Sequence, residues 1–376
     1  DSHITRHSPS ITMSETFFGK APLNRVSFLR GDTNFIDKAL NHDSSIFIPY
    51  VEGEALVKDN SLLLLTRPDI EPILEKVVPI LNTPKVSLKY SGVNFSFIGL
   101  HEGGSFKYKE YEGIPYFAID FRSKKDTLVG PDDVAFLSLY PKLSRTEIFT
   151  WGNEIASIYS HGKMYLDWLA KYQYCPSCGS EIYPVDAGTR LKCSNQNTDA
   201  NCAVRDANVN NVCFPRTDPV VIVAITTSDY SKLCLARSKR KYGNSVLYST
   251  IAGFMEPAET VEHACIREIW EETGVECSRI NIICTQPWPY PVNLMIGCVG
   301  VVDWNGKNEL INLSHDEELL DAQWFDTTEI ARYMDSYQGD GLVEFKDGIN
   351  FPGNTAIAHQ LISYVCDKFK RNQANL

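Results

Sequence analysis

A short segment rich in carboxylates is the first candidate for chemistry in this sequence. Residues 253–275 read GFMEPAETVEHACIREIWEETGV and hold six glutamates beside a single arginine, Arg267. Crowding negative charge in this way is unfavourable unless cations bind among the side chains. Clustered carboxylates suit Mg²⁺ or Mn²⁺, which keep waters and share phosphate oxygens. The segment therefore predicts a divalent metal site that acts on a phosphate ester.

Three glutamates of this segment are spaced so that one helix face would carry them. Glu268 precedes Glu271 by three residues and Glu272 by four, and residues at these separations are neighbours on a helix. Arg267 is expected to pair with a neighbouring carboxylate and fix its orientation. Gly253 allows a sharp turn that brings the preceding strand near the helix. A solvated acidic helix is the alternative, but this combination of residues favours metal binding.

Four of the eleven cysteines form a second candidate site. Cys175, Cys178, Cys193 and Cys202 fall within 28 residues, whereas the other seven are scattered. Four thiolates suffice for a closed tetrahedral zinc site, which would be structural rather than catalytic. A redox dithiol is the alternative for the first pair, but no thioredoxin-like pattern surrounds it. The spacing leaves the fourth ligand open between Cys202 and Cys213.

The elements that must position the carboxylates follow the cysteines. The run PVVIVAIT at 219–226 is continuous, apolar and β-branched, as in a strand buried on both faces. Thr260 is a good N-cap, and Gly274 is a good residue for ending a helix. Alternating strands and helices predict a mixed sheet with helices on both faces. The other predicted elements are strands in KLCLARS, VLYSTIAG, 280–285, 294–303 and AQWFD, and helices at about 261–273 and 354–369.

The first 150 residues show no catalytic constellation and predict a folded accessory domain. An interrupted helix is expected at 68–81, because prolines punctuate that stretch. Residues 151–172 have helical spacing, with Gly162 expected to interrupt the middle. Strands are expected in 86–100, 115–121 and 134–140.

The composition is that of a globular protein of more than one domain. The chain has 376 residues, of which 43% are hydrophobic and 22% charged, and it has no run of eighteen apolar residues that predicts a membrane span. A net charge of −11 argues against non-specific nucleic-acid binding as the main activity. Arg237, Lys239, Arg240 and Lys241 form a local basic strip, which is interpreted as a solvated loop.

Both ends of the chain carry features to set apart from the fold. Residues 1–12 are polar and precede Met13, so they are interpreted as tag-like. The tripeptide Ala374-Asn375-Leu376 resembles a variant of the Ser-Lys-Leu peroxisomal address. Because a three-residue match also arises by chance, a cytoplasmic location is the alternative.

The acidic segment also resembles a known motif. At every defined position it matches the Nudix box, G-x5-E-x7-R-E-U-x-E-E-x-G-U, in which U is bulky and apolar. Nudix enzymes hydrolyse a nucleoside diphosphate linked to another moiety. The resemblance implies an α/β fold, the Nudix α/β/α sandwich with a mixed sheet, behind a zinc ribbon and an α+β N-terminal domain.

A second motif lies beyond the box. The stretch Gln286-Pro-Trp-Pro-Tyr-Pro291 has alternating prolines that stiffen it and present Trp288 and Tyr290 as flat surfaces for stacking on a base or nicotinamide ring. An ordinary packing turn is the alternative. The stretch is similar to the SQPWPFPxS signature of the NADH pyrophosphatase subfamily, which also has a four-cysteine zinc ribbon and a separate N-terminal domain. The fungal peroxisomal NADH diphosphatases show the greatest similarity.

The resemblance implies roles for particular residues. Glu268 and Glu272 would hold the catalytic Mg²⁺ or Mn²⁺ with the Ala252 carbonyl. Glu318 is the further implied ligand, and Glu317 is the neighbour that can replace it. In this family two subunits build each site, so a homodimer is implied. The implied substrate contacts are Phe214, where a tyrosine is often found, Phe254, Gln286, Trp288, Tyr290, Asn293, which replaces a serine, Met295 and Ala358.

The predicted activity is metal-dependent hydrolysis of NADH or NAD⁺ to nicotinamide mononucleotide and AMP. Water, activated by metal and by Glu272 first or Glu271 second, attacks one phosphorus in line. The alternatives are removal of NAD caps from RNA by the same cleavage, and a zinc-ribbon binding module with an inactive Nudix domain. The predicted parts are an accessory Nudix-like domain at 13–150, a linking helix at 151–172, the zinc ribbon at 173–216, the catalytic Nudix domain at 217–366 and a tail at 367–376.

Overall fold

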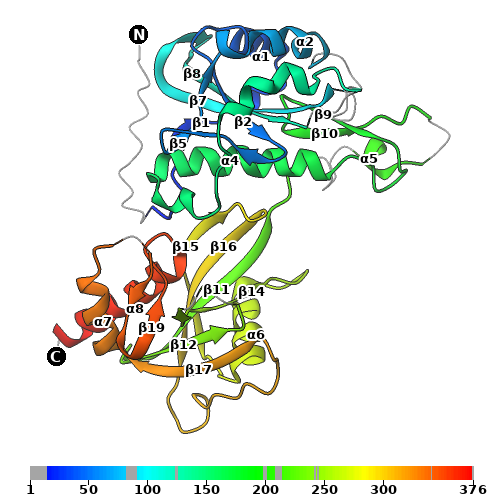
Figure 1. Ribbon diagram of the computed structural model, residues 1–376. Helices are drawn as coiled ribbons and strands as arrows, with labels where there is room; N and C mark the ends of the chain where they lie inside the picture. The colour runs from blue at the N-terminus through cyan, green and yellow to red at the C-terminus, as the bar shows by residue number, and fades with distance from the viewer. Residues whose placement is uncertain are drawn as a thin grey trace. The chain divides into compact units, whose positions relative to one another are not determined.

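The chain forms two compact units in the computed structural model (Figure 1). The amino-terminal unit comprises Ala21–Pro219 together with Pro287–Leu294. The carboxy-terminal unit comprises Val220–Gln286, the residues from Met295 onward, and the described residues up to Lys20. The predicted tag-like residues lie outside the described part of the chain. The described residues are 15–81, 91–122, 126–197, 201–207, 214–240, 243, 245–339 and 341–374.

A sheet with strand order β1-β7-β8-β2-β3 forms the centre of the amino-terminal unit, and β6 pairs with β2. Successive residues of β8 face opposite sides of this sheet. Phe117 and Ile119 join the apolar cluster that helices α1 and α2 cover, whereas Ala118 faces α4 (Figure 1). The bounds are β1 Leu23–Asn24, η1 Ser27–Leu29, α1 Thr33–Leu40, β2 Ile46–Val51, β3 Glu54–Ala55, β4 Val57–Lys58, β5 Ser61–Leu62, β6 Leu65–Thr66, η2 Pro68–Ile70, α2 Glu71–Leu81, β7 Val93–Tyr108, β8 Tyr111–Phe121, η3 Pro131–Leu139, η4 Glu147–Thr150 and α4 Asn153–Lys171.

Helix α4 is continuous, so the predicted interruption at Gly162 is wrong. A methyl group at Gly162 would lie 2.9 Å from the Cβ of Ala118 and 2.9 Å from the hydroxyl of Tyr50. The glycine therefore serves close approach between helix and sheet, and intrahelical hydrogen bonds hold the helix through it. The predicted interrupted helix at 68–81 is confirmed, because η2 leads directly into α2.

The strand predicted at 134–140 is also wrong, because this stretch belongs to the 3₁₀ helix η3. Pro131 begins the helix with a backbone angle that is already suited to it. The side chain of Asp133 accepts a 2.8 Å hydrogen bond from the backbone N–H of Gly130 and so caps the first turn. Only Leu137 of the helix is buried, so the apolar run does not alternate across a sheet.

A small hairpin follows α4 in the amino-terminal unit. Strands β9 Ile182–Val185 and β10 Arg190–Cys193 pair antiparallel, and the short helix α5 Ala203–Asp206 follows them. The apolar residues of this segment share a cluster with Trp168 and Leu169 of α4. The segment is thus packed against a helix that precedes it, as expected for a stretch too polar to form its own core.

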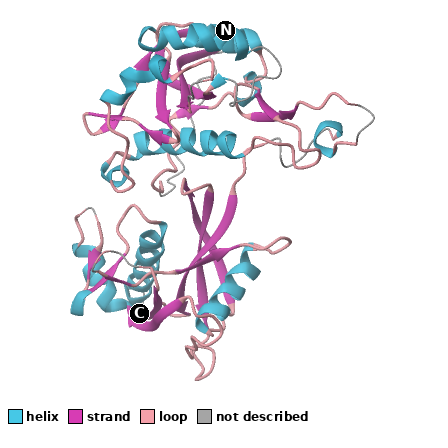
Figure 2. Ribbon diagram, turned by 45° about the vertical axis from the view of Figure 1, so that its right-hand side comes forward, coloured by secondary structure: helices cyan, strands magenta, loops and turns pink. Residues whose placement is uncertain are grey.

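The carboxy-terminal unit holds a sheet with strand order β15-β16-β11-β12-β17, to which β14 is added beside β11. Val221 and Val223 of β11 pack in the cluster of α6, whereas Ile222 and Ala224 pack in that of α7 and α8. Helices therefore cover both faces, as Figure 2 shows, which confirms the predicted α/β character. The bounds are β11 Asp218–Thr227, β12 Lys232–Ser238, β13 Val246–Leu247, β14 Ile251–Phe254, α6 Val261–Thr273, β15 Arg279–Trp288, β16 Asn293–Val302, β17 Leu319–Asp326, α7 Thr327–Ser336, β18 Val343–Glu344, η5 Lys346–Gly348, β19 Ile349–Phe351 and α8 Ile357–Ala374.

No helix within the described residues combines the length and apolar character needed to cross a membrane. Asn375 and Leu376 of the predicted peroxisomal address lie outside the described residues.

Candidate active site

Helix α6 carries the acidic motif, and its ends are set by capping. The Thr260 side chain accepts a 3.3 Å hydrogen bond from the N–H of His263, which satisfies a free donor of the first turn. Gly274 ends the helix with φ 70°, a left-handed conformation, and its N–H bonds the carbonyl of Trp270. The buried residues Ala264 and Ile269 fix the helix on the sheet. This packing determines which face presents the glutamates.

Arg267 is the centre of an ion-pair network. Its guanidinium donates to both oxygens of Glu259, at 2.6 and 2.9 Å, and to Glu268 at 2.7 Å. It also donates to Glu271 at 3.0 Å and to the carbonyl of Phe254 at 2.9 Å. The hydrogen bond from Arg267 lowers the pKa of Glu259 to about 2, and the reciprocal bond raises the pKa of Arg267. The arginine thus positions three carboxylates and one strand end.

Gly253 makes room for Glu268. A methyl group at residue 253 would lie 2.0 Å from the carboxyl carbon of Glu268 and 2.2 Å from each of its oxygens. The carboxylate therefore rests on the backbone of β14, where only hydrogen can fit. Ala252, the predicted carbonyl ligand, immediately precedes this glycine in β14 and is exposed. Strand β14 and helix α6 thus meet at Gly253, which is the first defined residue of the sequence motif.

Glu272 is the most buried carboxylate of the group, with 6% of its surface exposed. Burial, reinforced by the charges of Glu268 and Glu318, raises its pKa to about 8. Burial also raises the pKa of Glu268, against the opposing influence of Arg267. Neighbouring carboxylates thus destabilise the charged forms of both glutamates, and oxygen ligands crowded in this way suit a hard divalent cation.

The loop that carries Glu318 joins β16 to β17 and lies beside the end of β12. The N–H of Lys239 donates to the carbonyl of Glu318 at 3.3 Å, and the Lys239 ammonium lies 3.9 Å from Glu317. Glu318 is exposed, yet its charge influences both Glu268 and Glu272. A residue from outside the box thus joins the acidic group of the helix.

Trp270 and His315 hold the same loop against α6, and sequence reasoning missed them. Their ring centroids lie 4.4 Å apart, and His315 Nδ1 is 3.1 Å from the Trp270 carbonyl oxygen. Asn312 lies 3.1 Å from the other nitrogen of the imidazole, and its N–H donates to the carbonyl of Thr273. The sequence did hold one signal for this contact, a tryptophan between Glu268 and Glu271 of the motif, and the structure shows it exposed.

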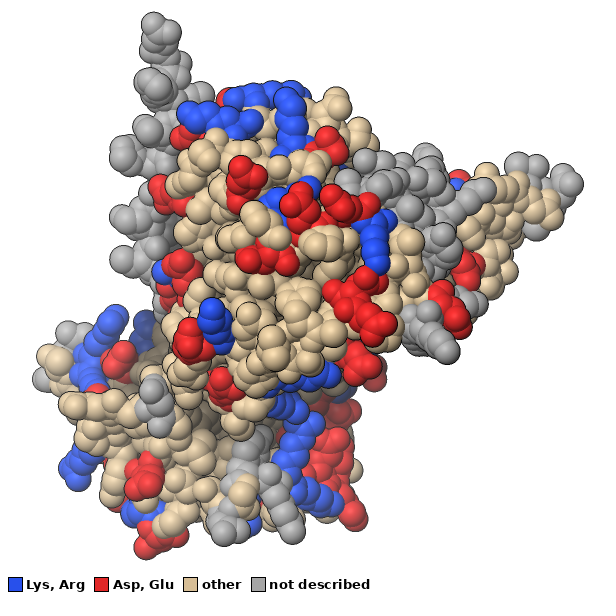
Figure 3. Space-filling view, turned by 45° about the horizontal axis from the view of Figure 1, so that its top comes forward, with Lys and Arg blue, Asp and Glu red and all other residues tan. Residues whose placement is uncertain are grey.

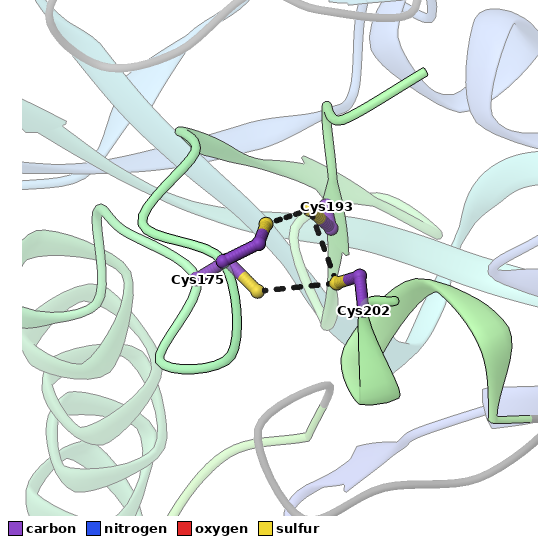
Figure 4. A group of neighbouring side chains, drawn as sticks. Cys175, Cys193 and Cys202 are labelled. Carbon is purple, nitrogen blue, oxygen red and sulfur yellow. Dashed lines mark hydrogen bonds between the residues drawn. The ribbon is translucent and has the colours of Figure 1, made fainter. Parts of the chain in front are cut away.

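The four predicted zinc ligands come together in the amino-terminal unit. All four sulfurs lie within 4.8 Å of one another, and they form the one such group of three or more candidate metal ligands in the described part of the chain. Cys175 and Cys202 are 3.7 Å apart, Cys178 and Cys193 3.5 Å, and Cys193 and Cys202 3.9 Å (Figure 4). The structure brings Cys202 to the other three, whereas Cys213 lies outside the described residues.

The electrostatics of the four thiols differ. Hydrogen bonding from Ser180 lowers the pKa of Cys178 to about 6, whereas burial raises the pKa of Cys193 to about 12. Burial also raises the pKa of Cys175. A soft divalent cation would stabilise all four as thiolates, and the set has the composition of a structural zinc site.

The aromatic stretch packs within the amino-terminal unit. The Trp288 ring stacks on Phe149 with centroids 5.9 Å apart and planes inclined by 26°. The hydroxyl of Tyr290 lies 3.4 Å from that of Tyr159, and the guanidinium of Arg145 lies 4.8 Å from the centre of the Tyr290 ring. Partners within the amino-terminal unit thus orient each of the two rings. Their role in substrate binding stays a prediction.

Gln286 is 1% exposed, and its side-chain amide is occupied by backbone partners. Its nitrogen donates to the carbonyls of Phe17 at 3.0 Å and Thr355 at 2.9 Å, and its oxygen accepts from the N–H of Ile357 at 3.0 Å. Ala358 follows in α8 and is buried in the core. These residues position the start of α8 in the structure. Their predicted contact with substrate stays a prediction.

The other predicted substrate contacts lie in different surroundings. Phe214 and Phe254 are exposed, and Met295 packs at the edge of the core. The side-chain oxygen of Asn293 is buried and has no hydrogen-bond partner among the described residues. Phe214 and Asn293 belong to the amino-terminal unit, whereas Phe254 and Met295 belong to the carboxy-terminal unit.

A family model described as NUDIX domain matches residues 216–343, and the chain belongs to the Nudix hydrolases. Within them it lies in the branch of NADH pyrophosphatase type. It is 57% identical to the NAD-capped RNA hydrolase NPY1 of Saccharomyces cerevisiae, covering 94% of this chain and 96% of that protein. It is 31% identical to the NAD-capped RNA hydrolase of Schizosaccharomyces pombe, covering 99% of each. It is 27% identical to NAD-capped RNA hydrolase NUDT12 of Homo sapiens, covering 93% and 73% respectively.

Proposed function

We propose that this protein hydrolyses the pyrophosphate of NADH and NAD⁺ to nicotinamide mononucleotide and AMP. The observation that carries the proposal is the carboxylate group of α6, held by Arg267 and seated on Gly253. Family membership and the names of the relatives, which specify hydrolases of NAD-capped RNA, support the same bond as the target. The complete glutamate set argues against the alternative of an inactive binding module.

The group would hold Mg²⁺ or Mn²⁺ through Glu268, Glu272, Glu318 and the carbonyl of Ala252. The raised pKa values of Glu268 and Glu272, both due first to burial and then to neighbouring carboxylates, support this donor set, because a cation would stabilise their charged forms. A bound divalent ion supplies neutralisation of the pyrophosphate and a more acidic water. Glu317 is the substitute for Glu318, although its ion pair with Lys239 directs it elsewhere in the structure.

Glu272 is the preferred general base, and Glu271 is the second choice. The pKa of Glu272 is raised to about 8 in the metal-free protein, and a bound cation would let this carboxylate ionise near neutral pH and accept a proton. Glu271 is engaged by Arg267 at 3.0 Å, which favours its ionised form and a positioning role. In the reaction the oxygen of water bonds to one phosphorus and the bridging P–O bond breaks. The base takes one proton of the water, and the two phosphates leave as separate mononucleotides.

The four-cysteine group would hold a structural Zn²⁺. Four sulfur ligands close a tetrahedral site and leave no position for substrate. The residues around it are rich in polar side chains, so a metal would contribute directly to their folding. The homodimer and the peroxisomal location are further proposals, supported by the family resemblance and, for location, by the carboxy-terminal tripeptide.

Removal of NAD caps from RNA is the second candidate function, favoured by the names of the three relatives. Lys239 and Arg240 are exposed where β12 ends, and the N–H of Lys239 bonds the Glu318 loop. This part of the basic strip therefore adjoins the acidic group, whereas Lys241 lies outside the described residues. On the face shown in Figure 3 acidic and basic side chains intermix, so RNA contact would be local.

A product assay tests these proposals. NADH, NAD⁺, ADP-ribose and NAD-capped RNA are each incubated with Mg²⁺ or Mn²⁺, and the products are separated. We expect reduced nicotinamide mononucleotide from NADH, nicotinamide mononucleotide from NAD⁺, and a 5′-monophosphate from capped RNA. Glu272→Gln should keep its fold and zinc content but lose nearly all turnover. Full turnover by this variant would reject the assigned base.

Salt separates the two substrate classes. Contacts to RNA phosphates release counterions, so cleavage of capped RNA should weaken steeply as salt rises while cleavage of NADH changes less. Lys239→Gln should lower only the cleavage of capped RNA, with Lys232→Gln, paired with Asp326 at 3.3 Å, as a matched control. Equal salt dependence for both substrates would contradict a role for RNA contacts.

A further inference from the structure

A cationic group that lies apart from the acidic site occurs in the amino-terminal unit. Arg25 and Arg30 flank the 3₁₀ helix η1, and His161 and Tyr165 project from one side of α4. Arg30 Nη1 donates to the Tyr165 hydroxyl at 3.2 Å, and its guanidinium lies 5.6 Å from the centre of that ring. The rings of His161 and Tyr165 are 5.3 Å apart. These contacts place two arginines and one histidine around a single tyrosine.

The most buried member of the group, Arg30, has two nitrogen atoms without a hydrogen-bond partner among the described residues. Arg30 is only 9% exposed, yet its Nε and Nη2 atoms are buried without a hydrogen bond among the described residues. Nε2 of His161 is buried and unpartnered as well. A buried charged donor without an acceptor is costly, and such groups in proteins are normally satisfied by a side chain, a water or an ion.

Within the described residues, no negative charge is paired with the two arginines of this group. Arg25 is influenced by Tyr165 and Arg30, and His161 by Arg25 and Arg30. Burial lowers the pKa values of both Arg25 and His161. Arg25 is exposed as a whole residue, but its guanidinium lies among protein atoms. No ion pair joins either arginine to a carboxylate within the described residues.

One carboxylate does approach this segment, but it is already paired. An oxygen of Asp186 lies 3.6 Å from where a methyl group on Gly31 would be. The other oxygen of Asp186 accepts a 2.6 Å hydrogen bond from Arg190, four residues further along. Asp186 therefore balances Arg190, and no carboxylate of the described residues forms an ion pair with Arg25 or Arg30.

We infer that Arg25, Arg30, His161 and Tyr165 form a binding site for a phosphoryl group. The planar guanidinium of Arg30 offers two parallel donors to the oxygens of a phosphate, and Tyr165 adds a hydroxyl. Arg25, an exposed residue whose charge interacts with Tyr165 and Arg30, is the second cation for the anion. The site lies in the amino-terminal unit, goes beyond the proposed hydrolysis and does not depend on it.

Phosphoryl groups reach such a site from three sources, namely inorganic phosphate, a free mononucleotide and the backbone of RNA. The protein is therefore titrated with sodium phosphate, AMP and a 5′-phosphorylated RNA oligomer, without added divalent metal. Under this condition the acidic group of α6 repels phosphate, so its contribution is small. We expect saturable binding of phosphate by calorimetry and a rise in Tm of roughly 4 °C at saturation.

Arg30→Met is the decisive variant. Methionine has similar length and no charge, so in phosphate-free buffer its Tm should equal or exceed that of the wild type, because an unpaired buried charge is removed. The phosphate-dependent rise in Tm should disappear. Tyr165→Phe, which removes only a hydroxyl, should weaken binding about tenfold and provides a second reading if Arg30→Met folds poorly.

Arg67→Met is the matched control, because Arg67 has a carboxylate partner, Glu71 at 2.9 Å, outside the site and should leave the phosphate response unchanged. Competition distinguishes the sources. If phosphate displaces both AMP and RNA, the phosphoryl group alone is recognised, whereas RNA that resists displacement assigns the site to the RNA backbone. Two outcomes overturn the inference: an absence of saturable phosphate binding to the wild type, or an equal response from wild type and Arg30→Met.

Discussion

Replacing Gly253 with alanine tests the assembled geometry of the acidic group by adding one carbon atom. The new methyl group would lie 2.0 Å from the carboxyl carbon of Glu268, whereas ordinary contact begins at 3.4 Å. The carboxylate must therefore retreat by about 3.4 − 2.0 = 1.4 Å. That movement also strains its 2.7 Å hydrogen bond from Arg267.

A misplacement of this size should reduce turnover strongly. Shifts of about 1 Å in a reacting group cost roughly 10²-fold, which corresponds to about 2.7 kcal/mol in the activation barrier. Residue 253 does not have a positive φ, and alanine reduces the freedom of the unfolded chain, so stability should change by less than about 1 kcal/mol. The assay is NADH hydrolysis with saturating Mg²⁺, accompanied by thermal unfolding of the same preparations.

A double variant shows whether the effect passes through Glu268. If the methyl group acts by displacing this carboxylate, then Gly253→Ala combined with Glu268→Gln should be no slower than Glu268→Gln alone. Gly152→Ala, at a position with φ −63° where nothing lies within 4 Å of the added methyl group, controls for a general effect of alanine. Wild-type turnover in Gly253→Ala, or losses that multiply in the double variant, would refute the argument.

Three further perturbations probe the same site and the cysteine group. Burial raises the pKa of Glu272 to about 8 from an ordinary 4.5, so metal-free protein should lose stability as pH rises from about 4.5 to 8, by a few kcal/mol, and Glu272→Gln should remove that slope in urea unfolding. Trp270→Ala frees His315 and the Glu318 loop, so the Mg²⁺ concentration for half-maximal turnover should rise about tenfold, and an unchanged value would exclude this positioning role. Cys202→Ser should lower the zinc content of the purified protein and expose residues 173–216 to protease, and full zinc retention would exclude Cys202 as a ligand.

Local signals in the sequence were sufficient to predict features that depend on residues within one or two helical turns. Thr260 and Gly274 define both ends of α6, because capping depends on groups within one turn of the helix end. The four-residue separation of Glu268 and Glu272 likewise places both on one face. The spacing of the cysteines left the fourth ligand open between Cys202 and Cys213, and the structure places the Cys202 sulfur 3.7 Å from that of Cys175.

Contacts between distant segments were beyond reach of the sequence. The partners of Gln286 include Phe17, separated from it by 269 residues, and Thr355, separated by 69. Gln286, a predicted substrate contact, is therefore enclosed by backbone groups that no local sequence pattern identifies. Similarly, the apolar run at 134–140 resembled a strand, but its capping by Asp133 and the burial of Leu137 alone favour a 3₁₀ helix.

The charges around Arg267 explain why a proton and a cation should compete for this site. Three carboxylates, of Glu259, Glu268 and Glu271, pair with one guanidinium, so 3 − 1 = 2 negative charges remain. Glu272 would add another beside them, and in a nearly dry position its neutral form is preferred. A divalent cation provides the two missing charges and lets Glu272 ionise, so metal binding should release a proton near neutral pH and tighten as pH rises through about 8.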